Sequence, residues 1–299
     1  MGFWETFDNA WKIVRKHKIL WLFGLLAYTP YAIFSWTISN KPQNALGITG
    51  AFLVFVVFIF ISTFGKVGLI QGVTLVKLGR AKLSWLGLLA AQKPHYWKTL
   101  VLTAALFTFG WVLRLLIPLI WSFFALFLQT FDLQPEGVWG WLSLLLSGIV
   151  VIITALYFGF YRLSPNGLVV EQLGFVAAVE RGWDVMRRDW KTVVGTTFTI
   201  GIVGAAYVLV SALPLVLLFA IVRFLGLDLF NPALGSWGHG ILDDVFVLAF
   251  YLPIGVILFA IWAAFEHAIW TLTFLRLTTK DAAVGTDTPP EPQDIPAQA

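Results

Sequence analysis

The stretch VAAVERGWDVMRRDWK, Val176–Lys191, sets the interpretation of the whole chain. Its apolar side chains recur at intervals of three and four residues, the spacing of one stripe of an α-helix. They are Val176, Val179, Trp183, Met186 and Trp190. Charged side chains occupy the other faces, and a long apolar segment follows directly at Thr192. A helix with an aromatic stripe and basic residues, joined to a membrane span, is typical of the headgroup layer of a bilayer.

The composition is that of a polytopic membrane protein. Of the 299 residues, 59% are hydrophobic and only 12% are charged, whereas soluble domains carry about 25% charged residues. Several apolar runs reach the length of roughly 20 residues that crosses a bilayer. The 15 tryptophans fit a class of protein that concentrates tryptophan at the membrane interfaces. The chain has no cysteine, which excludes disulfides, thiolate metal sites and a cysteine nucleophile.

The opening motif recurs along the chain. Residues 3–18 carry an aromatic stripe of their own, and Ala10–Lys16 (AWKIVRK) aligns with Gly182–Arg188 (GWDVMRR). A weaker copy covers residues 83–97 and is broken by Pro94. Because each copy precedes a pair of long apolar segments, the sequence predicts three related units, each an interfacial helix followed by a hairpin of two spans. The units cover about 3–76, 83–162 and 173–276.

The predicted fold is an all-α integral membrane bundle with six transmembrane helices and three amphipathic interfacial helices on the cytoplasmic side. The spans cover about 19–39, 48–76, 100–128, 138–161, 192–224 and 245–275. Residues 1–280 form one polytopic domain, and residues 281–299 form a disordered cytoplasmic tail. Of the 20 Lys and Arg residues, 16 fall on the side of the interfacial helices. This bias predicts a multi-pass protein of the cell (inner) membrane with both termini in the cytoplasm.

Two steps of small residues predict close contacts between spans. The first is Gly68 with Gly72, and the second is Thr197 with Gly201 and Ala205. Helices can approach closely at such positions because no bulky side chain separates their backbones.

Ionisable side chains inside predicted spans are the candidate functional residues: Lys66, Arg114, Glu266 and His267. Such residues are costly in a bilayer, so they mark a buried partner or a pathway. Lys66 and Glu266 lie at similar depth, about 15 Å from the cytoplasmic ends of their spans, which predicts an ion pair between them. Arg162, at the end of span four, is the alternative partner of Glu266. A fixed pair would lock the units together, whereas a proton relay or a transport path would need access for water.

The sequence shows no H-E-x-x-H, G-x-S-x-G or Walker motif. His239, Asp243 and Asp244 have a helical spacing that could hold a divalent metal, but these acids also suit a helix N-terminus. Three hard ligands without a fourth make a weak metal signal. We therefore expect no enzymatic activity, no cofactor or metal and no nucleic-acid partner.

The outer faces of the interfacial helices form a second candidate site. Its members are Trp11, Arg15, Lys16, Trp183, Arg187, Arg188, Trp190 and Lys191. Each basic residue near an anionic leaflet contributes about 1 kcal/mol, which favours binding to anionic lipid headgroups. Glu180, Asp184 and Asp189 dilute this charge, which weakens specific lipid recognition and favours docking of a soluble partner or domain instead. Generic anchoring in the bilayer is the remaining interpretation.

The motif Ala10–Lys16 followed by Leu20–Leu22 (LWL), with its echo at Trp183–Trp190, resembles a class of bacterial six-span membrane proteins. It is similar to the membrane domain fused to some bacterial glycerophosphodiester phosphodiesterases. The resemblance covers most of residues 3–275 in layout, without the soluble phosphodiesterase domain. What it implies is an accessory domain of the bacterial inner membrane, with no catalytic residues carried over.

The sequence thus favours a non-enzymatic membrane module that organises lipids or a partner at the cytoplasmic face. The rival interpretation is a small transporter or lipid-handling protein with a polar path through the four ionisable residues, and a membrane enzyme comes third. The two leading interpretations differ in one feature. A module should bury Glu266 dry against a base, whereas a transporter should line a water-filled cavity with it.

Overall fold

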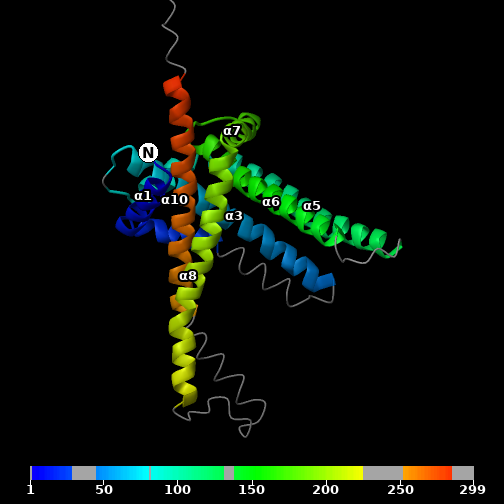
Figure 1. Ribbon diagram of the computed structural model, residues 1–299. Helices are drawn as coiled ribbons and strands as arrows, with labels where there is room; N and C mark the ends of the chain where they lie inside the picture. The colour runs from blue at the N-terminus through cyan, green and yellow to red at the C-terminus, as the bar shows by residue number, and fades with distance from the viewer. Residues whose placement is uncertain (1, 29–44, 81, 131–137, 225–251, 285–299) are drawn as a thin grey trace, which may run out of the picture.

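A computed structural model describes residues 2–28, 45–80, 82–130, 138–224 and 252–284 of the chain (Figure 1). These residues form helices and no strand, which confirms the all-α prediction. The helices are α1 (Phe3–Lys16), α3 (Ala45–Lys77), α4 (Trp85–Gln92), α5 (Tyr96–Thr130), α6 (Val138–Val170), α7 (Phe175–Arg188), α8 (Trp190–Phe224) and α10 (Leu252–Val284). A further helical segment, Ile19–Tyr28, follows α1.

Four of the described helices contain stretches long and apolar enough to cross a membrane. The stretches are Leu53–Lys77 in α3, Ser147–Val170 in α6, Trp190–Ser211 in α8 and Ile254–Thr279 in α10. The chain therefore has the helical character of a membrane protein. The other two predicted spans correspond to the segment that begins at Ile19 and to α5, and the six-span arrangement stays a prediction.

The long helices diverge from one common region, beyond which the C-terminal part of α10 (red) projects (Figure 1). There, α5 and α6 pack against each other and run away from the end where α7 lies. In another direction, α8 runs beside the N-terminal half of α10. Of the short helices, α1 packs on α10, α4 on α3 and α7 on α6. The region where the long helices meet is therefore also where the short helices attach.

The helices α1 and α7 match each other in length, in the glycine that precedes them and in the position of their buried small residues. Each has 14 residues and follows a glycine in an extended conformation, Gly2 or Gly174. The aligned residues Ala10 and Gly182 are both buried, so small side chains let each helix lie closely on its neighbour. The equivalence seen in the sequence therefore extends to the bounds and the buried faces of these two helices.

The predicted middle interfacial helix differs from the other two. α4 ends before Pro94, where the sequence predicts a break, and Trp97 belongs to α5. Ser84 caps its N-terminus by accepting a hydrogen bond from the Gly87 amide at 3.1 Å. With the sequence WLGLLAAQ, α4 is apolar on nearly all sides. The prediction of an amphipathic helix is therefore wrong here, because the charged residues of this region lie outside the helix.

Contacts between helices form at both small-residue steps, although not at every residue of the second. A Cβ added at Gly72 of α3 would lie 2.6 Å from the Leu20 side chain, so the first prediction is confirmed. In the second step, Thr197 of α8 donates to the Ala155 carbonyl of α6 at 3.4 Å, whereas a Cβ at Gly201 would meet no described atom within 4 Å, so that prediction is confirmed at Thr197 and wrong at Gly201. The close contact between α8 and α10 forms at Gly204, where Trp262 packs on the helix.

The C-terminal helix extends into the predicted disordered tail. α10 continues to Val284, so the first residues of that tail are helical, and the rest of it lies outside the described residues. The segment that precedes α10, with His239, Asp243 and Asp244, also lies outside them.

Candidate functional site

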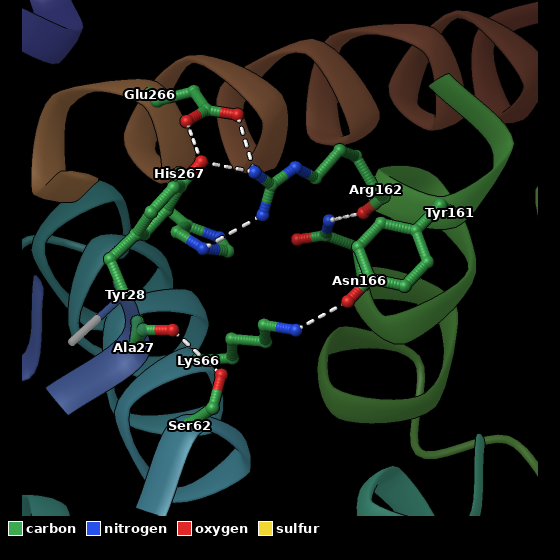
Figure 2. A network of polar contacts seen from close by, with 9 residues as sticks. All are labelled: Ala27, Tyr28, Ser62, Lys66, Tyr161, Arg162, Asn166, Glu266 and His267. Carbon is green, nitrogen blue, oxygen red and sulfur yellow. Dashed lines mark hydrogen bonds and ion pairs between the residues drawn. The ribbon is translucent and has the colours of Figure 1, made fainter. Parts of the chain in front are cut away.

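Polar residues converge where the long helices meet and form what we call the polar cluster (Figure 2). Its members are Tyr28, Lys66, Tyr161, Arg162, Glu266 and His267. Each of the three predicted units contributes two of them. The members from α6 and from α10 are adjacent in sequence, and they contact residues that lie far away in the sequence. Three of the four ionisable candidates meet here. The fourth, Arg114, lies in α5, and its side chain is outside the described part of the structure.

An ion pair between Arg162 and Glu266 lies at the centre of the polar cluster. Nη2 of Arg162 is 2.6 Å from Oε1 of Glu266, and the two side chains are 7% and 4% exposed. The Tyr28 hydroxyl donates to Oε2 of the same carboxylate and accepts from Nη2. Arg162 also donates through Nη1 to Nε2 of His267, 3.0 Å away. Since a guanidinium has only donors, the imidazole accepts through Nε2.

The predicted ion pair between Lys66 and Glu266 is wrong, and Arg162, the alternative partner, takes its place. The reason is the length of α6. The sequence predicts that this span closes at Tyr161, but α6 continues to Val170. Arg162 therefore lies about 12 Å inside the end of the helix at 1.5 Å per residue. At this position inside the helix, the Arg162 side chain reaches Glu266.

The helix continues through Pro165, and the polar side chains on either side of this proline bind carbonyl groups of the preceding turn. Ser164 donates from Oγ to the Phe160 carbonyl at 2.9 Å, and Asn166 donates from Nδ2 to the Arg162 carbonyl at 2.7 Å. A proline removes one backbone donor from a helix, here the donor to the Tyr161 carbonyl, and these two bonds lie on the carbonyls on either side of it. The continuity of α6 at this point is what positions Arg162.

Lys66 has uncharged partners. Its Nζ donates to the Tyr161 hydroxyl at 2.5 Å and lies 4.9 Å from the centroid of the same ring. The residue is 8% exposed. The ion pairs of the described residues do not include Lys66. The polar cluster thus holds two bases, Lys66 and Arg162, and one acid, Glu266.

A small cavity adjoins the polar cluster. Its lining consists of Lys66, Ile70, Tyr161, Arg162, Pro165 and His267. The volume is about 10 Å³, the room that one water molecule needs. Glu266 does not line it. Nearby, Nε of Arg162 and Oδ1 of Asn166 have no hydrogen-bond partner among the described residues.

The tryptophans of the second candidate site lie on the outside of the molecule. Trp11, Trp183 and Trp190 are exposed, and so are the five basic residues predicted to lie beside them. Trp11 makes an edge contact with Phe265 of α10, and Trp183 makes one with Phe160 of α6. The first two rings thus lie at the junction of a short helix with a long one.

The helix α7 is held on α6 by a face that the stripe pattern did not reveal. The buried residues are Ala178, Gly182, Val185 and Met186. A Cβ at Gly182 would lie 3.0 Å from the Cα of Ser164. An ion pair adds to this contact, since Nε of Arg181 lies 3.0 Å from Oε2 of Glu171 at the end of α6. Of the five residues in the predicted stripe, only Met186 is buried.

Two histidines outside the membrane-spanning segments favour the neutral form. Burial, and then the charge of Lys16, lower the pKa of His17, which follows the last residue of α1. Burial, and then the charge of Lys98, lower the pKa of His95, which precedes α5. In both cases the folded chain disfavours the protonated ring.

Sequence reasoning identified Lys66, Glu266 and His267 because a titratable residue within an apolar run is conspicuous. It missed Tyr28 and Tyr161, whose hydroxyls bind the charged groups. Tyrosine is a common residue at membrane interfaces, so its position near the predicted end of a span carries little information. The sequence signal for Tyr161 is its position directly before Arg162, a charged residue that already had a predicted partner.

Comparison of the chain with models of known protein families, with curated proteins and with solved structures found no match. The polar cluster and the outer faces of α1 and α7 therefore carry the functional interpretation on their own.

Proposed function

We propose that the chain is a non-enzymatic module of a bacterial inner membrane that organises lipids or a partner at the cytoplasmic face. In this proposal it crosses the membrane six times as three hairpin units, with both termini in the cytoplasm. The helices α1 and α7 lie in the headgroup layer, where their bases favour anionic lipids. The membrane domain of bacterial glycerophosphodiester phosphodiesterases, which the sequence resembles, would be a module of the same kind.

The observation that carries the proposal is the shared outer surface of α1 and α7. Each helix exposes a tryptophan and has two basic residues in its last turn, Arg15 and Lys16 or Arg187 and Arg188. Indole rings prefer the membrane interface, and each base near an anionic leaflet gains about 1 kcal/mol. Two such surfaces in one region of the molecule would form a headgroup-binding face.

The polar cluster supports a module that holds one shape. Glu266 is buried and bound to both Arg162 and Tyr28. Ala263, about one turn away in α10, is also buried. A buried ion pair with further hydrogen bonds opposes rearrangement, because separating it would leave a charge without a partner inside the protein. Such a lock suits a scaffold better than a pathway that must open.

Lipid selectivity tests the proposal. The full chain is reconstituted in bilayers that contain traces of spin-labelled phosphatidylglycerol or phosphatidylcholine, and electron paramagnetic resonance measures the fraction of each probe that the protein immobilises. We expect the unmodified chain to prefer the anionic probe several-fold. The preference should fall towards unity when four bases are replaced by glutamine, namely Arg15, Lys16, Arg187 and Arg188.

A matched control separates a specific headgroup face from general attraction by charge. It replaces four other exposed bases by glutamine: Lys77, Lys82, Lys93 and Lys98. This variant loses the same formal charge and should keep most of the preference. Equal losses in the two variants would mean that charge alone attracts the lipids, and a preference unchanged in the first variant would rule out α1 and α7 as its source.

The alternative is a small transporter or lipid-handling protein with a polar path through the bundle. The cavity beside Lys66 is the observation in its favour. A single cysteine at Ala263, in a chain that has none, tests it with a membrane-impermeant thiol reagent in sealed vesicles. Labelling would favour transport. No labelling, while a control cysteine at the exposed Lys12 reacts, would favour the module.

A further inference from the structure

The charges of the polar cluster do not balance. Lys66 and Arg162 are buried bases, and Glu266 is the one acid among the buried residues that the structure describes. His267 adds no positive charge, because its Nε2 accepts a hydrogen bond from Arg162 and a ring that accepts is neutral. Since Glu266 is bound to Arg162, the positive charge that is left over belongs to Lys66.

No carboxylate among the described residues pairs with Lys66. The Tyr161 hydroxyl accepts one hydrogen bond from Nζ, and the ring adds a cation–π contact. An ammonium group has three donors, so two remain. An uncompensated charge at this depth in a membrane protein is costly. A counter-charge close to Nζ would remove this cost.

The cavity beside Lys66 has the lining of an anion site. The polar side chains that line the cavity are Lys66, Tyr161, Arg162 and His267. Each of them can donate a hydrogen bond, and no carboxylate belongs to the lining. Tyr161 accepts from Lys66 and so keeps its own hydroxyl proton free to donate. The buried Arg162 has a further donor, Nε, with no partner among the described residues.

We propose that this cavity binds one small inorganic anion of the size class of chloride, which supplies the counter-charge for Lys66. The volume of about 10 Å³ suits a single small occupant, so a monatomic anion fits better than phosphate or a lipid headgroup. The anion completes the lock between the three predicted units. The proposal is independent of lipid binding by α1 and α7.

Thermal unfolding of the full chain in detergent micelles tests the proposal. Sodium chloride replaces sodium gluconate, whose anion is too large for the cavity, at constant ionic strength. We expect the unfolding midpoint to rise saturably with chloride, by roughly 5 °C at about one hundred times the dissociation constant. Bromide should act in the same way. An identical midpoint in chloride and gluconate would overturn the proposal and leave a water molecule as the occupant.

Two variants of α3 locate the effect. Lys66→Met should abolish the dependence on chloride, and Lys77→Met, at the exposed end of the same helix, should retain it. A dependence that persists in Lys66→Met would refute the site. If Lys66→Met does not fold, chlorine NMR on the unmodified protein decides. We expect excess line width that bromide displaces, and a line width equal to that of empty micelles would refute the proposal.

Discussion

Removing Arg162 should destabilise the protein more than removing both members of its ion pair. In the variant Arg162→Met, the carboxylate of Glu266 stays buried and loses its charged partner. Adding Glu266→Gln takes the unpaired charge away. The second substitution should therefore stabilise the first variant, although it destabilises the unmodified chain when it is made alone.

The magnitude follows from the geometry of the pair. At the 2.6 Å separation of Nη2 and Oε1, two unit charges attract by about 6 kcal/mol at an effective dielectric constant of about 20. Taking the two ions out of water costs several kcal/mol for each, so the intact pair contributes little net free energy. Removing Arg162 alone leaves the cost of burying the Glu266 carboxylate but takes away its attraction to Arg162. The free energy of unfolding should therefore fall by about 3–5 kcal/mol. The double variant should regain roughly 2–4 kcal/mol of that loss.

Equilibrium unfolding by SDS in mixed micelles, at one fixed chloride concentration, gives the free energy of unfolding of all four proteins. The control is a double-mutant cycle on the exposed ion pair of Asp8 and Lys12, whose side chains are 56% and 68% exposed. Its coupling free energy should not exceed about 0.5 kcal/mol. The reasoning would be refuted if the losses in the Arg162 and Glu266 cycle were additive and the double variant were the least stable of the four.

Three further predictions concern other parts of the fold. Gly65→Ala should lower the free energy of unfolding by about 1–3 kcal/mol, because the new Cβ would lie 2.7 Å from the Cα of Ala27. Gly201→Ala, which meets no described atom within 4 Å, is its control in the same micelle assay, and equal losses would contradict the prediction. Gln172→Gly should raise the free energy of unfolding by about 1 kcal/mol, since Gln172 has a φ of 56°; a less stable variant on thermal unfolding would argue against strain there. The folded chain lowers the pKa of His17, so the unfolded chain binds more protons as the pH falls through about 6.5, and stability should decrease in that range. His17→Asn should flatten the dependence of the unfolding midpoint on pH, and an unchanged profile would exclude His17 as its source.

The sequence alone determined the class of the protein and the position of its helices, because both depend on local properties. Long apolar runs can satisfy their backbone groups in lipid only as helices or closed barrels, and helical spacing marks the short amphipathic segments. The predicted helices at residues 3–18 and 176–191 therefore agree with Phe3–Lys16 and Phe175–Arg188 to within a few residues.

Helix ends near prolines and charges were less predictable. Arg162 and Pro165 together resemble the end of a span, yet α6 continues through both. One condition for this lies outside the local pattern: Glu266, more than one hundred residues further along the chain, neutralises Arg162.

The tertiary structure alone decided which side chains are buried and which charges pair. In water, the apolar stripe of a helix has to face the protein, but lipid is as apolar as a protein interior. In the proposed interfacial position, the stripe of α7 is therefore free to point outward with Trp183, while the small residues Ala178 and Gly182 pack on α6. The packing of the helices also decides which charged side chains meet. Arg162 pairs with Glu266, and Lys66 contacts a tyrosine. Hydropathy cannot distinguish lipid from protein as the neighbour of an apolar face, and only the packed helices do.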